Sequence, residues 1–211
     1  MAAAKHASVV AAPQNARSRR TRAALLAATR SVLEEAGFDG LTMAAVAERA
    51  GVTRRALYLH FASRTELVAS LFDHIAAEEG LADLTAAIWE APTARVALER
   101  WASFLAVYHP RLIAVTRAVE AVRERDADAR AHWRHVTNAQ QANCRRLANW
   151  LADEEALAEP WTAQSAAEML WAMISTDLIE RLLRERRWST RRLASALSIV
   201  FERTFVRPPS S

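Results

Sequence analysis

Cysteine, glycine and proline are all scarce in this chain of 211 residues, and each shortage excludes a class of structure. The single cysteine, Cys144, cannot form a disulfide within one chain, which fits a reducing cytoplasm. Four glycines and six prolines leave few turn positions, while the abundant alanine, leucine and arginine all favour helix. No segment convincingly alternates apolar and polar residues as a half-buried strand does. We therefore expect an all-α fold.

Long apolar runs and N-terminal acidic residues are also missing. No apolar run reaches the roughly 18 residues that cross a membrane, and Lys5 and His6 interrupt what would otherwise resemble a signal peptide. We expect a cytoplasmic protein with no membrane partner. Residues 1–30 contain Lys5 and several arginines but no acid. This basic arm suits phosphate contact, although an ordinary solvated tail is the alternative.

Residues 41–67 carry local signals for three short helices with tight joints. Thr42 is a good N-cap, Gly51 can take the positive φ at which the first helix ends, and Thr53 caps the second helix. A capping box of the form Ser-x-x-Glu, beginning at Ser63, opens the third helix. A helix, a glycine turn and a second helix with a polar start form the helix-turn-helix pattern.

Helical spacing of apolar residues predicts further helices on both sides of this stretch. A helix from about 18 to 36 should end at Gly37. Prolines should mark helix breaks in the second half, which gives expected helices near 63–79, 81–90, 93–108, 110–125, 128–156, 161–187 and 190–206. The expected inward-facing residues of the N-terminal region are Leu25, Val32, Leu33, Phe38, Leu41, Val46, Ala47, Val52, Leu57 and Phe61.

The segment from about Ser18 to Leu67 resembles the DNA-binding domain of TetR-family transcriptional repressors. The resemblance rests on an opening helix ending in Ala36-Gly37-Phe38, then Leu41-Thr42, Val46-Ala47, Ala50-Gly51-Val52-Thr53, Leu57-Tyr58, His60-Phe61 and Ser63-Arg64-Thr65-Glu66-Leu67. It covers about a quarter of the chain, and the rest agrees with the family only in being helical and of suitable length.

The resemblance implies a homodimer that binds a double-stranded DNA operator and is released by a small-molecule inducer. Each subunit would place its recognition helix in the major groove of one half-site, and the inducer would bind in the C-terminal domain. The expected organisation is a disordered tail at 1–16, a helix-turn-helix domain at 17–65, a helical ligand-binding and dimerisation domain at 66–207, and a disordered tail at 208–211.

Positions that match the family's DNA contacts are Thr42, Thr53, Arg54, Arg55, Tyr58, His60 and Arg64. The arginines at 54 and 55 are candidates for base readout, because a guanidinium reaches O6 and N7 of guanine with two donors. Phosphate contact or solvation is their alternative role. Ala56 offers only a methyl group, where the family often has Ser or Thr. The remaining matching side chains are candidates for phosphate contact, with helix capping or core packing as alternatives.

Large side chains of the second half are candidates for an inducer pocket or a dimer interface. An apolar or aromatic ligand could lie against Trp101, Phe104, Tyr108, Trp133, Trp171 and Met173, with Trp89 and Trp150 as further candidates, although core packing is the alternative for any one of them. The segment 166–179 is apolar nearly all round, so a partner chain is expected to cover one side. With the last helix it would form a four-helix interface through Trp171, Leu178, Leu182, Leu197, Val200 and Phe201.

Two other classes of function remain open at this point. The chain could be a helical dimer that acts as a protein-interaction or activator module without ligand control. It could also be a small helical enzyme or a metal carrier, but no coupled acid, base or ligand set is visible. We therefore expect neither enzymatic activity nor a cofactor or metal.

Overall fold

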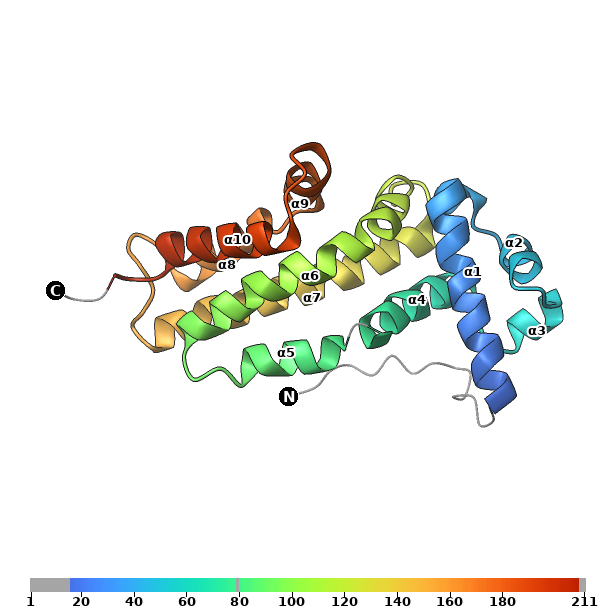
Figure 1. Cartoon of the computed structure of the whole chain (residues 1–211), viewed down its shortest axis with the longest axis horizontal. Coiled ribbons are helices and arrows are strands. Elements are labelled where there is room, and N and C mark those ends of the chain that lie inside the picture. The colour runs from blue at the N-terminus through green and yellow to red at the C-terminus, as the bar shows by residue number, and fades with distance from the viewer. Residues whose placement is uncertain (1–15, 79, 209–211) are drawn as a thin grey trace. The chain divides into compact units, whose positions relative to one another are not determined.

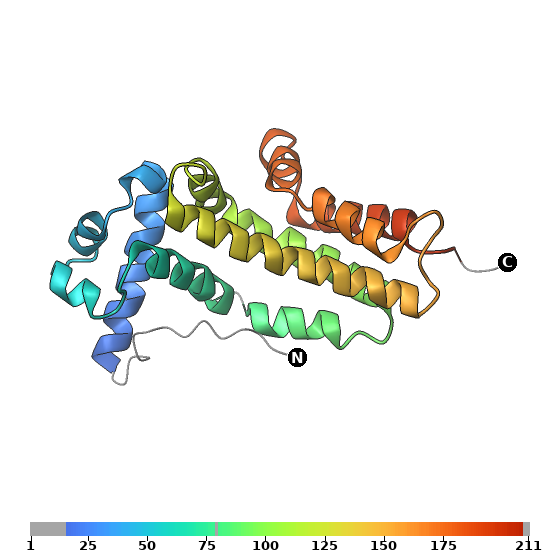
Figure 2. The ribbon, with the colours of Figure 1, turned by 180° about the vertical axis from the view of Figure 1, so that it is seen from behind.

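A computed structural model of the chain describes residues 16–78 and 80–208, and every regular element in them is helical (Figures 1 and 2). The elements are α1 (Ala16–Gly40), α2 (Met43–Arg49), α3 (Arg54–Tyr58), α4 (Arg64–Glu78), α5 (Leu81–Trp89), α6 (Ala94–Glu120), α7 (Ala127–Asp153), α8 (Ala163–Met173), α9 (Thr176–Glu180), the π-helix η1 (Arg181–Glu185) and α10 (Thr190–Phe205). The expected all-α fold is confirmed. The tails expected at the two ends lie mostly outside the described residues.

The chain divides into two compact units, and each is described by itself. Unit 1 contains the residues up to 76 together with 114–133, and unit 2 contains 77–113 and 134–211. Helices α6 and α7 therefore contribute to both units. The functional regions expected from the sequence, 17–65 and 66–207, have different bounds from these two units.

The predicted start and stop signals of unit 1 are present in the structure. The backbone leaves helical geometry at Gly37, which has φ 65° and ψ −169°, so α1 is interrupted where the sequence indicated its end. The side chain of Thr42 caps α2, and the side chain of Thr53 caps α3. At the start of α4, Ser63 Oγ accepts a hydrogen bond from the Glu66 amide, while the Glu66 carboxylate reaches the Ala62 amide. These local bonds fix where each short helix begins.

Two predicted helix boundaries in the second half are wrong. Pro110 lies inside α6 instead of ending a helix, although it cannot donate to the carbonyl one turn earlier. Ala106 and Ile113 are buried on either side of it, so packing keeps one continuous helix. The helix expected at 161–187 is instead divided into α8, α9 and η1. The break follows from Ser175, whose side chain accepts from the Leu178 amide and starts a new helix.

The core of unit 2 is formed by apolar side chains from α6, α7, α8 and α10. Leu98, Trp101 and Leu105 of α6 pack in one buried cluster with Leu147 of α7 and Phe201 of α10. Figures 1 and 2 show α6 beside α7 and α8 beside α10. The carboxylate of Glu154, just after α7, accepts from the amide that opens α6 at 3.0 and 3.1 Å, which closes that end of the helix pair.

Candidate nucleic-acid interface

Helix α2 is held against α1 by a buried apolar side and an exposed ion pair. Val46 and Ala47 of α2 are buried. On the surface, the Arg49 guanidinium donates to both carboxylate oxygens of Glu35 on α1, at 2.7 and 2.8 Å. These hydrogen bonds from Arg49, with one from Ser31, lower the pKa of Glu35 to about 2. The first helix of the pair is therefore fixed on the α1 scaffold.

A glycine turn joins α2 to α3. Gly51 has φ 65°, a left-handed conformation that favours glycine, and a Cβ added there would meet no atom within 4 Å. Glycine is therefore favoured at this position by the backbone conformation and not by lack of room for a side chain. The Val52 amide donates to Ala47 O at 3.0 Å, and Thr53 Oγ1 then accepts from the Ala56 amide at 3.1 Å. The turn closes with its amides paired, and α3 begins at a defined residue.

Helix α3 has a fully buried side and a strongly exposed side. Leu57, and Phe61 just beyond the helix, are 0% exposed. The opposite side presents four exposed side chains, which we call the reading face: Arg54, Arg55, Tyr58 and Leu59. Tyr58 is 46% exposed and Leu59 is 69% exposed. Burial of one side of so short a helix fixes the direction in which the reading face points.

Leu59 is a member of the reading face that was not predicted from the sequence. Its 69% exposure is high for a leucine, and it follows α3 directly as the C-cap residue. An exposed leucine beside arginines can make apolar contact with a thymine methyl group. The helical spacing alone could have indicated it, because Leu59 lies four residues after Arg55 on the same side of the helix.

Arg22 of α1 contacts the residues that follow α3 and links them to α4. Its guanidinium donates to His60 O at 3.2 Å and to Ser70 Oγ of α4 at 3.0 Å, and it lies 4.3 Å from the centre of the Phe61 ring. One side chain thus joins α1, the end of α3 and α4. Burial, and then the charge of Arg22, lowers the pKa of His60. His60 is therefore a neutral hydrogen-bonding group near pH 7.

Arg64 has partners within unit 1. Its guanidinium forms an ion pair with Asp126 and lies 4.6 Å from the centre of the Phe38 ring. Asp126 also accepts from the amides of Asp128 and Ala129 at 3.0 Å each, which caps the start of α7. Burial raises the pKa of Asp126, but these hydrogen bonds and Arg64 together lower it further than burial raises it. A phosphate contact of Arg64 stays a prediction, and it would compete with this carboxylate.

The structure brings together four of the six side chains first expected around a ligand, since Trp101 and Phe104 belong to one buried cluster and Tyr108 and Met173 pack against it. Trp101, Phe104 and Tyr108 form a stacked series on α6, with successive ring centres 5.3 Å apart. Trp133 belongs to unit 1, where the Arg123 guanidinium lies 4.2 Å from its ring centre. Trp171 is exposed, and Met173, at the end of α8, is part-buried. Among the described residues, Trp133 and Trp171 are not members of the cluster that holds Trp101.

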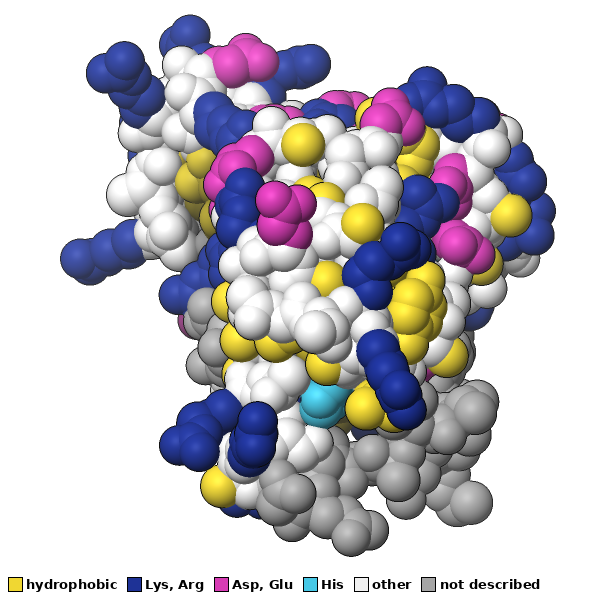
Figure 3. All heavy atoms as spheres, turned by 90° about the vertical axis from the view of Figure 1, so that its right-hand side faces the viewer, with side chains coloured by type: hydrophobic (Ala, Val, Ile, Leu, Met, Phe, Trp, Pro, Cys, Tyr) yellow, Lys and Arg dark blue, Asp and Glu magenta, His cyan; other side chains and the backbone are white. Residues whose placement is uncertain are grey.

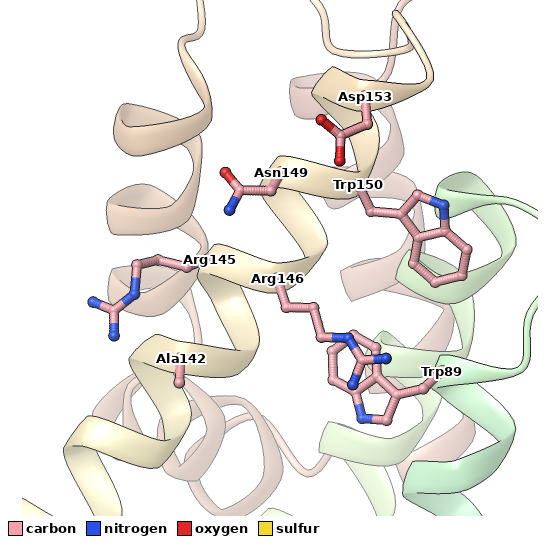
Figure 4. A pocket seen from close by; sticks show the side chains of 7 residues that line it. All are labelled: Trp89, Ala142, Arg145, Arg146, Asn149, Trp150 and Asp153. Carbon is pink, nitrogen blue, oxygen red and sulfur yellow. The ribbon is translucent and has the colours of Figure 1, made fainter. Parts of the chain in front are cut away.

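Unit 2 also has an open groove of about 560 Å³ that contains two of the candidate ligand residues, Trp89 and Trp150, but none of the other six (Figure 4). The Arg146 guanidinium lies 3.9 Å from the centre of the Trp89 ring in it. The groove is lined by Trp89, Ala142, Arg145, Arg146, Asn149, Trp150 and Asp153. It is therefore a mixed polar and aromatic surface rather than an apolar cavity.

The residues expected at a dimer interface fall into two groups. Leu197 and Phe201 are buried in the core of their own chain, and Leu178 and Leu182 are part-buried. Trp171 and Val200 are exposed. The full set of exposed large apolar side chains on α8 and α10 is Met169, Trp171, Ile199 and Val200. We call this set the apolar face, and sequence periodicity did not distinguish it from the buried side of α10.

Comparisons with known proteins agree with this architecture. Residues 25–71 match the family model of bacterial regulatory proteins, tetR family. No curated protein matches the sequence. None of the described helices combines the length and apolar character that a membrane crossing requires.

Three solved structures are similar to the chain over most of its length. NalD from Pseudomonas aeruginosa, the secondary repressor of the MexAB-OprM multidrug efflux pump, is 21% identical with a TM-score of 0.69, and the match covers 92% of this chain and all (100%) of NalD. FadR, the fatty acid degradation regulator from Bacillus halodurans, is 14% identical with a TM-score of 0.68, covering 86% and 94%. A Saccharomonospora viridis protein solved with choline is 14% identical with a TM-score of 0.71, covering 90% and 100%. At these identities the likeness establishes the fold.

Proposed function

We propose that this protein is a ligand-responsive transcriptional repressor that acts as a homodimer on a palindromic DNA operator, because residues 25–71 match the family model of bacterial regulatory proteins, tetR family. The observation that carries the proposal is the reading face of α3. Its four side chains project into solvent, while Leu57 and Phe61 anchor the other side of the helix. A helix so fixed by its buried side can enter a major groove with a defined register.

Each member of the reading face has a role in the proposed complex. Arg54 and Arg55 read guanine through paired donors to O6 and N7. Tyr58 donates its hydroxyl to a phosphate, and Leu59 contacts a thymine methyl. Thr42 and Thr53, which cap α2 and α3, also fit phosphate contact. A threonine oxygen that accepts a hydrogen bond from an amide can still donate its own O–H to a phosphate.

The apolar face supports a second copy of this chain as the partner. Its exposed side chains come from α8 and α10, which lie side by side in Figures 1 and 2. A two-fold contact places the same face of each copy against the other, so two pairs of helices pack together and water leaves Met169, Trp171, Ile199 and Val200. Two reading faces related by that two-fold axis match a palindromic operator.

The stacked series on α6 supports an apolar or aromatic ligand. The indole N–H of Trp101 is buried, and no described residue accepts its hydrogen bond. A buried donor without a partner is costly, so a ligand with a flat apolar body and an acceptor atom would stabilise this position. NalD is a repressor, and the Saccharomonospora viridis protein holds choline. These neighbours support repression and a small-molecule ligand, respectively.

Selection of DNA by the full chain tests the proposal. Purified protein is incubated with random-sequence duplexes, and bound duplexes are amplified and sequenced. The expected result is enrichment of an inverted repeat bound by two copies of the chain. Protein that binds no duplex even at low salt would contradict the proposal. A protein that binds the duplex, keeps it in the presence of every small molecule tested and recruits a protein partner would instead be an interaction module.

The ligand class is tested with 2-naphthol, which has a flat apolar body and an oxygen acceptor. We expect 2-naphthol to release the selected duplex from the wild type. Trp101→Phe keeps the ring stack but removes the N–H, so it should weaken release while leaving DNA affinity unchanged. Equal release from both proteins would exclude Trp101 from the ligand site.

A further inference from the structure

Charge is strongly segregated along α1 in unit 1. The acidic residues of α1 are Glu34, Glu35 and Asp39, near its C-terminal end, and each forms an ion pair. The N-terminal end carries Arg17, Arg19 and Arg20 instead, all exposed, and no described residue forms an ion pair with them. The preceding residues 1–15 contain no acid either. We call these three side chains the α1 arginine patch.

Figure 3 shows the side of the molecule where α2 and α3 lie. Acidic side chains lie in the upper part of the view, whereas basic side chains lie in both the upper and the lower parts. In Figure 1 the start of α1 is at the lower end of that helix, and α3 lies closer to this end than α2 does.

The bond between Arg22 and His60 places the patch relative to α3. Arg22 NH1 donates to His60 O at 3.2 Å, so α1 contacts the end of α3 at this residue. Arg20 and Arg17 precede Arg22 by two and five residues, which is about 3 and 8 Å along a helix that rises 1.5 Å per residue. Arg19 lies one turn before Arg22 on the same side. The patch therefore extends α1 beyond the C-terminal end of α3.

We propose that the α1 arginine patch is a second DNA-binding site, which holds backbone phosphates outside the base pairs read by α3. The inference rests on the proposed function, because the duplex is located by the reading face. Exposed guanidinium groups without carboxylate partners can bind phosphate oxygens with little rearrangement. Phosphate contacts carry no base preference but fix orientation and strengthen binding at low salt. The partner is duplex DNA, and the contact lies in the sequence that flanks each half-site.

The test compares two duplexes chosen by the selection experiment. The long duplex extends one helical turn beyond the selected site on each side, and the short duplex ends at the edges of that site. The test variant is Arg17→Ala/Arg19→Ala/Arg20→Ala in the full chain. The control variant, Arg134→Ala/Arg186→Ala/Arg207→Ala, removes the same charge from exposed positions of unit 2. Affinities are measured over a series of salt concentrations.

The expected signature is a change in salt dependence confined to the long duplex. Each lost phosphate contact reduces the magnitude of the slope of log K against log salt by about 0.9. For three arginines, the slope of the test variant should therefore be smaller by up to roughly 2.7 per subunit. The control variant should keep the wild-type slope. Replacement of the same three residues by lysine should restore most of it, because lysine keeps the charge.

Two results would overturn different parts of this reasoning. A wild-type slope for the test variant on the long duplex would refute the second site and leave the proposed function intact. Wild-type protein that binds neither duplex at low salt would refute the proposed function itself. Circular dichroism of each variant checks that the fold is retained, which is expected because substitutions at exposed positions usually change stability little.

Discussion

Arg22 lies among the basic residues of α1, yet the structure gives it a structural role. Its guanidinium donates to His60 O and Ser70 Oγ and covers the Phe61 ring. We predict that Arg22→Met destabilises unit 1 even in the absence of DNA. Methionine keeps an apolar stem of similar length, so the change removes the charge and donors with the least loss of packing.

The expected size follows from the three interactions that are lost. Two hydrogen bonds in a part-buried site contribute about 1 kcal/mol each, and a guanidinium over an aromatic ring adds about 0.5–1 kcal/mol. The total is roughly 2–3 kcal/mol. For a chain of this size, each kcal/mol shifts Tm by about 2–4 °C, so we expect a decrease of about 4–12 °C.

Thermal unfolding followed by circular dichroism measures this decrease. The matched control is Arg20→Met, which removes one exposed arginine two residues away, and its Tm should stay within about 2 °C of the wild type. The reasoning would be refuted if Arg22→Met kept the wild-type Tm and instead weakened DNA binding like a lost phosphate contact.

Three further predictions concern separate features of the chain. Asp126→Asn should lower stability by up to about 1 kcal/mol at neutral pH, because Arg64 loses its ion pair. Because the pKa of Asp126 is lowered in the folded state, this contribution exists above pH ~4 and is lost as pH falls through the folded-state pKa. The stabilities of the wild type and of Asp126→Asn should therefore converge in acid, and a difference that stays constant with pH would contradict the prediction. Burial raises the pKa of Cys144 to about 12, so a thiol reagent should label it only after denaturation, and rapid labelling of native protein would show that the thiol is accessible. Leu59→Ala should reduce preference for one base pair of the selected site by about 1 kcal/mol without changing the salt slope, and a slope change in the titration would indicate a different role.

The helix-turn-helix could be predicted from the sequence because its signals are local. Thr42 and Thr53 cap helices through bonds to amides three residues away, and Gly51 takes a positive φ. The predicted inward residues are buried, Leu57 and Phe61 fully so, except Val52 in the turn, which is part-buried. Such features depend on neighbours within a few residues, which a sequence displays directly.

Features that depend on distant partners could not be predicted in this way. The Arg64–Asp126 ion pair joins residues 62 positions apart, and nothing near Arg64 in the sequence indicates that carboxylate. Pro110 stays inside a helix because buried residues on both sides hold it. The apolar stripe of α10 includes both Phe201, which is buried, and Val200, which is exposed, and periodicity alone does not show which side its own chain covers.

The central claim is that the reading face of α3 recognises DNA sequence. The most direct measurement is the affinity of wild type, Arg54→Ala and Arg55→Ala for the selected duplex and for a duplex of scrambled sequence. The wild type should prefer the selected duplex, and each variant should lose roughly 5- to 150-fold on it, the equivalent of about 1–3 kcal/mol, with a smaller loss on the scrambled duplex. Equal affinity of the wild type for both duplexes, or equal losses on both in the variants, would contradict sequence readout by α3.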